Sequence, residues 1–100
     1  MSKPVVYDFF ATWCGPCRMQ APILEELGKK LGDKVEIKKI DVDEHRDLAE
    51  KYGISVVPTL IIEKDGKIIQ RLEGVTDGAT LEHVIEQLDQ KDQQALPPNN

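Results

Sequence analysis

The stretch VVYDFFATWCGPC, residues 5–17, decides the fold of this chain. Its first half, residues 5–10, is apolar without alternation except at Asp8, which is typical of a strand buried on both faces. A turn follows, and Pro16 then suits the first turn of a helix, where its missing N–H costs little. The stretch therefore predicts a strand, a turn and a helix, with both cysteines at the point where the helix begins.

Three helices are expected along the chain. Residues 41–43 supply N-cap candidates for a short middle helix, and Asp77 or Thr80 can cap the last one. The first helix should carry a kink at Pro22 and end at Gly32-Asp33. Apolar residues at helical spacing mark the first and last helices: Met19, Ile23, Leu24, Leu27 and Leu31, then Leu81, Val84, Ile85 and Leu88.

Three further strands complete the expected sheet. Residues 35–40 alternate between apolar and polar, and residues 59–62 form a short apolar run. Asp65-Gly66 is a hairpin signal, after which residues 68–72 return antiparallel. The element order β-α-β-α-β-β-α predicts an α/β fold, in which a four-stranded mixed sheet has three helices distributed over both faces.

The composition is that of one globular domain. The 100 residues are 40% hydrophobic and 31% charged, and we place the domain at residues 1–89 and a disordered tail at 90–100. The chain has 13 Lys and Arg residues and 18 Asp and Glu residues, so its net charge is 13 − 18 = −5. It therefore lacks the excess of basic residues that is typical of a nucleic-acid binder. No apolar run approaches the roughly 18 residues that span a membrane. No export signal is visible at the start, so we expect a cytoplasmic protein.

The two cysteines suit thiol–disulfide chemistry. Their spacing brings both sulfurs onto one face of the first helical turn, within disulfide range. Free N–H groups and the helix dipole, worth up to ~2 kcal/mol, lower the pKa of Cys14 toward neutrality and make it the attacking thiolate. Cys17, one turn inward, should be more shielded and resolve the mixed disulfide. The alternatives are two inert buried thiols or half of a metal site between subunits.

The stretch Trp13-Cys14-Gly15-Pro16-Cys17 resembles the active-site signature of the thioredoxin family. The resemblance implies a thioredoxin-like fold and a monomeric protein-disulfide reductase that needs no metal or organic cofactor. It implies disulfide-containing client proteins and a thioredoxin reductase, linked to NADPH or ferredoxin, as partners. The similarity covers about residues 4–89 and extends through Asp8-Phe9-Phe10-Ala11, Val57-Pro58-Thr59, Lys64-Asp65-Gly66 and Gly74-Val75.

The resemblance assigns roles outside the dithiol. Pro58 matches the family's cis-proline, and the cis form of a bond before proline costs only ~0.5–1 kcal/mol. This proline leaves the backbone of Val57 free to pair with an extended client. Without the motif, a trans proline opening a strand would be expected. Asp8 matches a buried acid of raised pKa that accepts the Cys17 proton, the alternative being an exposed residue at a strand end. Lys39 matches a lysine that accompanies this acid, or else lies on a solvated strand face.

Three further positions complete the expected site. Trp13 is expected to pack against the loop and shield the dithiol, although an exposed aromatic there would be an ordinary contact residue. The Gly15-Pro16 pair between the cysteines accompanies a reducing potential in relatives. Gly74 matches a glycine at the rim of the substrate groove, with a plain turn glycine as the alternative.

Two other functions stay open on the sequence. The same fold can act as a disulfide oxidase or isomerase, and it can serve as a non-catalytic binding subunit. Family members commonly begin with one more strand and helix before the position of Lys3, for which we expect no room here. The strand at residues 35–40 would then be an edge, where Lys38-Lys39 discourages association between sheets.

Overall fold

The structure is a computed structural model that describes residues 3–94. Strands, helices and one short 3-10 turn (η1) follow one another in the predicted order, so the predicted thioredoxin-like α/β architecture is confirmed. The elements are β1 (Val5–Phe10), α1 (Gly15–Leu31), η1 (Gly32–Lys34), β2 (Glu36–Asp41), α2 (Arg46–Lys51), β3 (Thr59–Lys64), β4 (Lys67–Glu73) and α3 (Gly78–Gln94).

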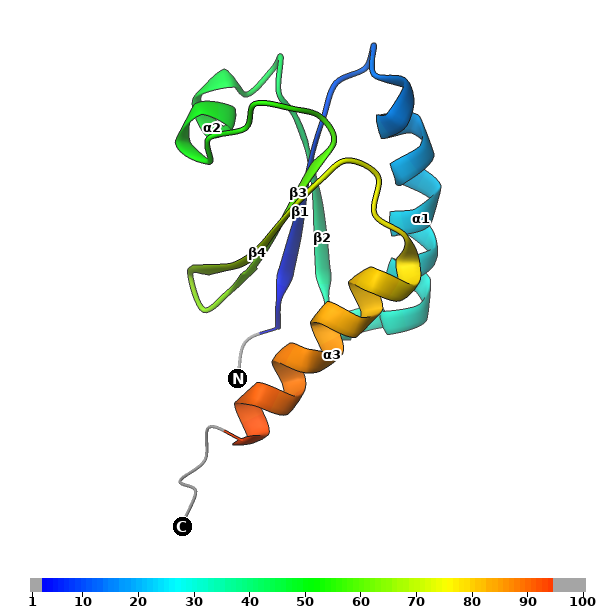
Figure 1. The fold of residues 1–100 in the computed structure, drawn as a ribbon, viewed down its shortest axis with the longest axis vertical. Helices are drawn as coiled ribbons and strands as arrows, with labels where there is room; N and C mark the ends of the chain where they lie inside the picture. Colours follow the sequence, from blue (N-terminus) through cyan, green and yellow to red (C-terminus); the bar gives the residue numbers. More distant parts are fainter. Residues whose placement is uncertain (1–2, 95–100) are drawn as a thin grey trace.

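The four strands form one mixed sheet in the order β2-β1-β3-β4. β1 runs parallel to β2 and antiparallel to β3, and β4 returns antiparallel to β3. α1 and α3 cover one face of the sheet and α2 lies over the other, as Figure 1 shows. β2 is an edge strand, as expected from the sequence.

The hydrophobic core is divided between the two faces of the sheet. The larger cluster lies under α1 and α3 and consists of Val6, Leu24, Leu27, Val35, Leu60, Ile62, Leu81, Ile85 and Leu88. On the opposite face, Phe9, Ile40 and Ile61 pack with half-buried Tyr7 and Tyr52, among others. Successive residues of a strand point to opposite faces, so the apolar run of β1 supplies both clusters.

Two predicted turns are confirmed, whereas the predicted start of α2 is wrong. Gly32 ends α1 with a positive φ of 57°, and Asp65 and Gly66, at φ 55° and 78°, form the turn between β3 and β4. Residues 41–43 do not cap α2, whose N-cap is His45 without a side-chain cap hydrogen bond. The reason is that Asp41 uses its carboxylate for the N–H of Asp43, 2.9 Å away, and so closes the turn after β2.

The buried face of α1 differs from the predicted stripe at its first position, whereas the other predicted residues pack in or against the core. Met19, expected in the core, is 63% exposed, whereas Gln20 is fully buried. The helix continues through Pro22 without an interruption. α3 extends to Gln94, beyond the boundary placed at residue 89, and residues 95–100 of the expected tail lie outside the described residues.

Candidate active site

Cys14 and Cys17 are joined by a disulfide at the start of α1. Cys14 is the N-cap residue, and the N–H of Cys17 donates to its Sγ at 3.1 Å. Gly15 and Pro16 occupy the first positions of the helix, and the missing N–H of proline is tolerated there. The first-turn amide and the positive end of the helix dipole therefore meet the sulfur of Cys14, which favours a thiolate there.

The expected difference in shielding between the two cysteines is not present in the disulfide. Each is 5% exposed, so Cys17 is no more buried than Cys14. A bond between the sulfurs holds both side chains against the same small cluster, which also contains Ala11.

The segment before β3 lies beside the sulfur of Cys14. The carbonyl oxygen of Val57 is 3.6 Å from the Cys14 Sγ, and the bond from Val57 to Pro58 is cis. Within residues 3–94, the backbone of Val57 makes no hydrogen bond to another backbone group. An extended peptide could therefore pair with Val57 next to the disulfide.

Gly74 borders the same place. Its N–H donates to the carbonyl oxygen of Pro58 at 2.9 Å, which joins the end of β4 to the segment before β3. Its φ of 88° disfavours other residues, and a Cβ there would meet no atom within 4 Å. The positive φ explains the glycine at this turn, and open space lies next to its Cα.

Asp8 lies in the middle of β1 and is 1% exposed, so the alternative of an exposed strand-end residue is wrong. It points to the same face as Val6, which packs against α1, the helix that carries Cys17. Its Oδ1 has no hydrogen-bond partner among the described residues. Burial raises the pKa of Asp8 to about 6, and the positive charge of Lys39 acts in the opposite direction.

Lys39 stands opposite Asp8 in the parallel pairing of β1 with β2. Its side chain is exposed, and its Nζ lies 5.3 Å from the centroid of the Phe10 ring. The structure therefore combines the two expectations for Lys39: it is solvated, and it still acts electrostatically on Asp8.

Trp13 is 68% exposed. Its indole Nε1–H donates to a carboxylate oxygen of Asp43 at 3.0 Å, which ties the residue before Cys14 to the turn after β2. Sequence reasoning missed Asp43, because nothing in its local pattern points to a residue 30 positions away. Trp13 also borders a shallow pocket of about 160 Å³ with Val42, Ile54, Ser55, Val56 and Val57.

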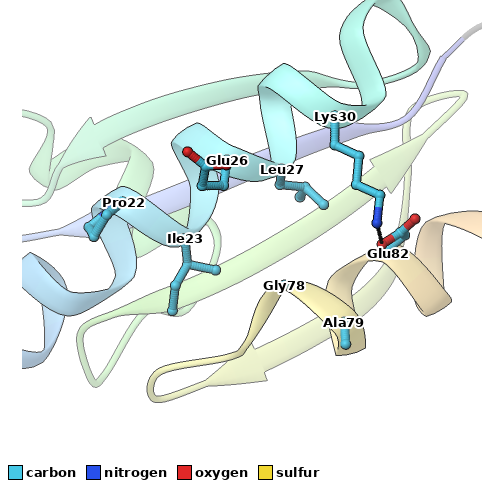
Figure 2. A pocket seen from close by; sticks show the side chains of 8 residues that line it. All are labelled: Pro22, Ile23, Glu26, Leu27, Lys30, Gly78, Ala79 and Glu82. Carbon is cyan, nitrogen blue, oxygen red and sulfur yellow. Dashed lines mark hydrogen bonds and ion pairs between the residues drawn. The ribbon is translucent and has the colours of Figure 1, made fainter.

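A separate groove of about 510 Å³ lies between α1 and α3, and Figure 2 shows the side chains that line it. None of the predicted site residues borders it. Lys30 and Glu82 form an ion pair of 2.9 Å across one end, and Pro22, Ile23 and Ala79 contribute to its walls. The groove is thus distinct from the disulfide site.

Among the described residues, no helix combines the length and apolar character that crossing a bilayer requires.

Comparisons with known proteins identify the family of this chain. The family model named Thioredoxin matches residues 1–87. A thioredoxin of Bacillus subtilis (strain 168) is 47% identical over 81 residues, which are 81% of this chain and 78% of that protein. A chloroplastic thioredoxin Y of rice, Oryza sativa subsp. japonica, is 48% identical over 84 residues, which are 84% of this chain and 50% of that protein.

A solved structure extends the similarity to three dimensions. The oxidised form of mitochondrial thioredoxin 3 from Saccharomyces cerevisiae superposes with a TM-score of 0.77 at 38% sequence identity. The match covers 87% of this chain and 80% of that one.

Proposed function

Because this chain belongs to the thioredoxin family and is a protein-disulfide reductase, we propose that its residues divide the exchange reaction between attack, resolution and client binding. In the first step the thiolate of reduced Cys14 attacks one sulfur of a client disulfide. A mixed disulfide forms, and the other client sulfur leaves as a thiolate and takes a proton from water. The observation that carries this assignment is the Cys17 N–H at 3.1 Å from the Cys14 Sγ, at the helix N-terminus.

The second step releases the client. Asp8 accepts the proton of Cys17, directly or through water, and the Cys17 thiolate attacks the Sγ of Cys14. The second client sulfur leaves and is protonated, so two electrons have moved to the client and the chain holds the Cys14–Cys17 disulfide. A carboxyl group with a pKa of about 6 is mostly ionised at pH 7 and can accept this proton. Lys39 supports the ionised form through its positive charge.

The client binds as an extended segment beside the unpaired backbone of Val57, in the manner of an added strand. Gly74 leaves space for that segment because it has no side chain. Exposed apolar side chains from the surrounding segments, Trp13, Met19, Val56 and Val75, contact the client around the disulfide.

The partners follow from the reaction. Each turnover leaves a disulfide, so a thioredoxin reductase, linked to NADPH or ferredoxin, must return two electrons to it, which makes the chain an electron carrier. We place this cycle in the cytoplasm, where thiols are kept reduced, and the protein acts there as a monomer.

The order of attack is tested by trapping the mixed disulfide. Cys17→Ser retains the attacking thiol but cannot resolve, so it should accumulate a covalent complex with insulin that dithiothreitol releases. Cys14→Ser is the matched control and should trap less than about a tenth as much. Non-reducing electrophoresis and mass spectrometry measure both. Equal trapping by the two variants, or more by Cys14→Ser, would contradict the assignment.

A further inference from the structure

One buried polar side chain has no part in the proposed reaction. Gln20 lies on α1 and is fully buried, although an amide inside a core is unfavourable unless it is hydrogen-bonded. Its Nε2 donates to the carbonyl oxygen of Thr76 at 2.9 Å, and its Oε1 accepts from the N–H of Thr76 at 2.8 Å. The carboxamide therefore satisfies both backbone groups of one residue that is 56 positions away in the sequence.

Thr76 belongs to the loop of residues 74–77, which connects β4 to α3. The loop is held at both of its ends: Gly74 donates to the carbonyl oxygen of Pro58, and the carboxylate of Asp77 accepts from the N–H of Thr80 at 2.8 Å. Its middle depends on Gln20, since the one other hydrogen bond there among residues 3–94 joins the Thr76 hydroxyl to the carbonyl oxygen of Gly74 at 3.4 Å.

This loop presents Val75 to solvent directly after Gly74, beside the segment that contains Pro58. Gln20 itself lies one turn after Cys17 on α1. One side chain thus connects the helix that carries the dithiol to the loop that borders the client position.

We infer that Gln20 is a positioning residue for client recognition: its carboxamide holds the loop of residues 74–77 in the conformation that receives a client segment. The inference rests on the proposed function, because the loop matters only if clients bind beside Val57. Without the two hydrogen bonds from Gln20, the N–H and carbonyl of Thr76 must turn toward water, and Val75 leaves its fixed position. Each binding event would then have to order the loop again, which weakens binding of protein clients and leaves the sulfur chemistry intact.

The test compares Gln20→Met, which removes both hydrogen bonds at similar length, with the wild type and with Lys30→Met. Lys30→Met is the matched control because it removes the exposed ion pair of Lys30 with Glu82, which joins α1 to α3, and keeps the hydrogen bonds of Gln20 to the loop. Reduced protein is mixed with insulin at increasing concentrations, and the rate of its oxidation gives a half-saturating concentration and a limiting rate. The same variants are mixed with 5,5′-dithiobis(2-nitrobenzoic acid), a small disulfide that needs no groove.

For Gln20→Met we expect a half-saturating insulin concentration about five- to tenfold higher, with the limiting rate and the small-disulfide rate within about twofold of wild type. Amide hydrogen exchange at Thr76 should become faster, while Lys30→Met should match the wild type in every readout. An insulin half-saturation no higher than that of Lys30→Met would overturn the inference, as would an equal loss toward insulin and the small disulfide. Failure of the wild type itself to reduce insulin would instead contradict the proposed function.

Gln20→Glu provides an internal rescue, should the methionine variant be poorly folded. A buried glutamate is neutral when protonated and can then donate to the Thr76 carbonyl, whereas its ionised form cannot. Its half-saturating insulin concentration, relative to wild type at each pH, should fall toward the wild-type value as the pH is lowered from 8 to 6. If the ratio of the two half-saturating insulin concentrations does not change with pH, the proposed role of the Gln20 carboxamide is contradicted.

Discussion

Asp8 makes the stability of this protein depend on pH. Its pKa is about 6 in the folded chain, against 3.8 when it is solvated, because burial disfavours the carboxylate. Between these two pH values the folded state binds more protons than the unfolded state, so stability decreases as the pH rises. Above about pH 6 Asp8 is ionised in the folded state as well, and the full cost of burying its charge lowers the stability. The pKa difference of 6 − 3.8 corresponds to a cost of at most about 3 kcal/mol.

Asp8→Asn should therefore stabilise the protein and impair it at the same time. We expect a gain in unfolding free energy at pH 7 of about 1–3 kcal/mol and a flatter pH dependence between pH 4 and 7, because the amide does not ionise. Insulin reduction at pH 7 should slow, since nothing accepts the Cys17 proton. Urea unfolding at several pH values measures the first effect, with Asp33→Asn, an exposed site on η1, as control. Unchanged turnover would remove Asp8 from the mechanism.

At the scale of single elements, α1 shows which features of a helix can be predicted from the sequence and which cannot. Its start is predictable because the determinants are local: Pro16 suits the first turn, and Cys14 is placed to accept from a first-turn N–H. Its buried face is not fully predictable, since hydrophobicity favours Met19 over Gln20 for the core. The partner of Gln20 is a backbone group of a distant loop, and such a group leaves no trace in helical periodicity.

Strands and turns show the same division. The Asp65-Gly66 signal correctly predicts the β3–β4 hairpin, because two positive φ angles are a local requirement. The start of α2 is mispredicted, since Asp41 and Asp43 lie close together and local propensity does not tell which turn each will close. Glu63 is placed by its contact with another element, where its carboxylate accepts from the Tyr52 hydroxyl at 2.7 Å. Pairs of this kind become visible only in three dimensions.

The start of α3 allows a test at this scale. The carboxylate of Asp77 accepts from the N–H of Thr80, and hydrogen bonds from the side chain and then the backbone of Thr80 lower the pKa of Asp77. Asp77→Ala removes the cap and should lower the Tm by about 4 °C, whereas Asp77→Asn keeps an oxygen acceptor and should lose less than half of that. Since the cap favours the ionised carboxylate, the wild-type advantage over Asp77→Ala should shrink as the pH falls below the ordinary aspartate range. Thermal unfolding by circular dichroism measures both, and equal Tm values for the two variants would contradict the cap.

Over the whole molecule, the topology gathers the site from four separate segments. β1 ends and α1 begins at one end of the sheet, and because β3 is antiparallel to β1 it begins at the same end. β4, antiparallel to β3, ends there too and leads into the loop of residues 74–77. Figure 1 shows these connections at one end of the sheet. The dithiol motif is contiguous and can be found in the sequence, whereas Asp43 reaches Trp13, and Thr76 reaches Gln20, only because this topology brings their segments together.

The same topology leaves β2 at an edge of the sheet, where its outer backbone groups could pair with a second molecule. Lys38 and Lys39 point to opposite faces of this strand, so a second sheet would meet an ammonium group on either side. Replacing both with threonine removes the charges and raises strand propensity, so we expect dimers to form as the protein concentration increases.

Sedimentation velocity between about 10 µM and 1 mM would detect this association, and the wild type should remain a monomer throughout. The matched control replaces Lys29 and Lys34, which lie outside the sheet, with threonine. Both double variants change the net charge equally, to 11 − 18 = −7, so a difference between them isolates the position of the lysines from the total charge. If the two double variants associate to the same extent, the total charge and not the position of Lys38 and Lys39 keeps the molecules apart. If neither variant associates, the prediction is wrong, and the twist and short length of β2 protect this edge instead.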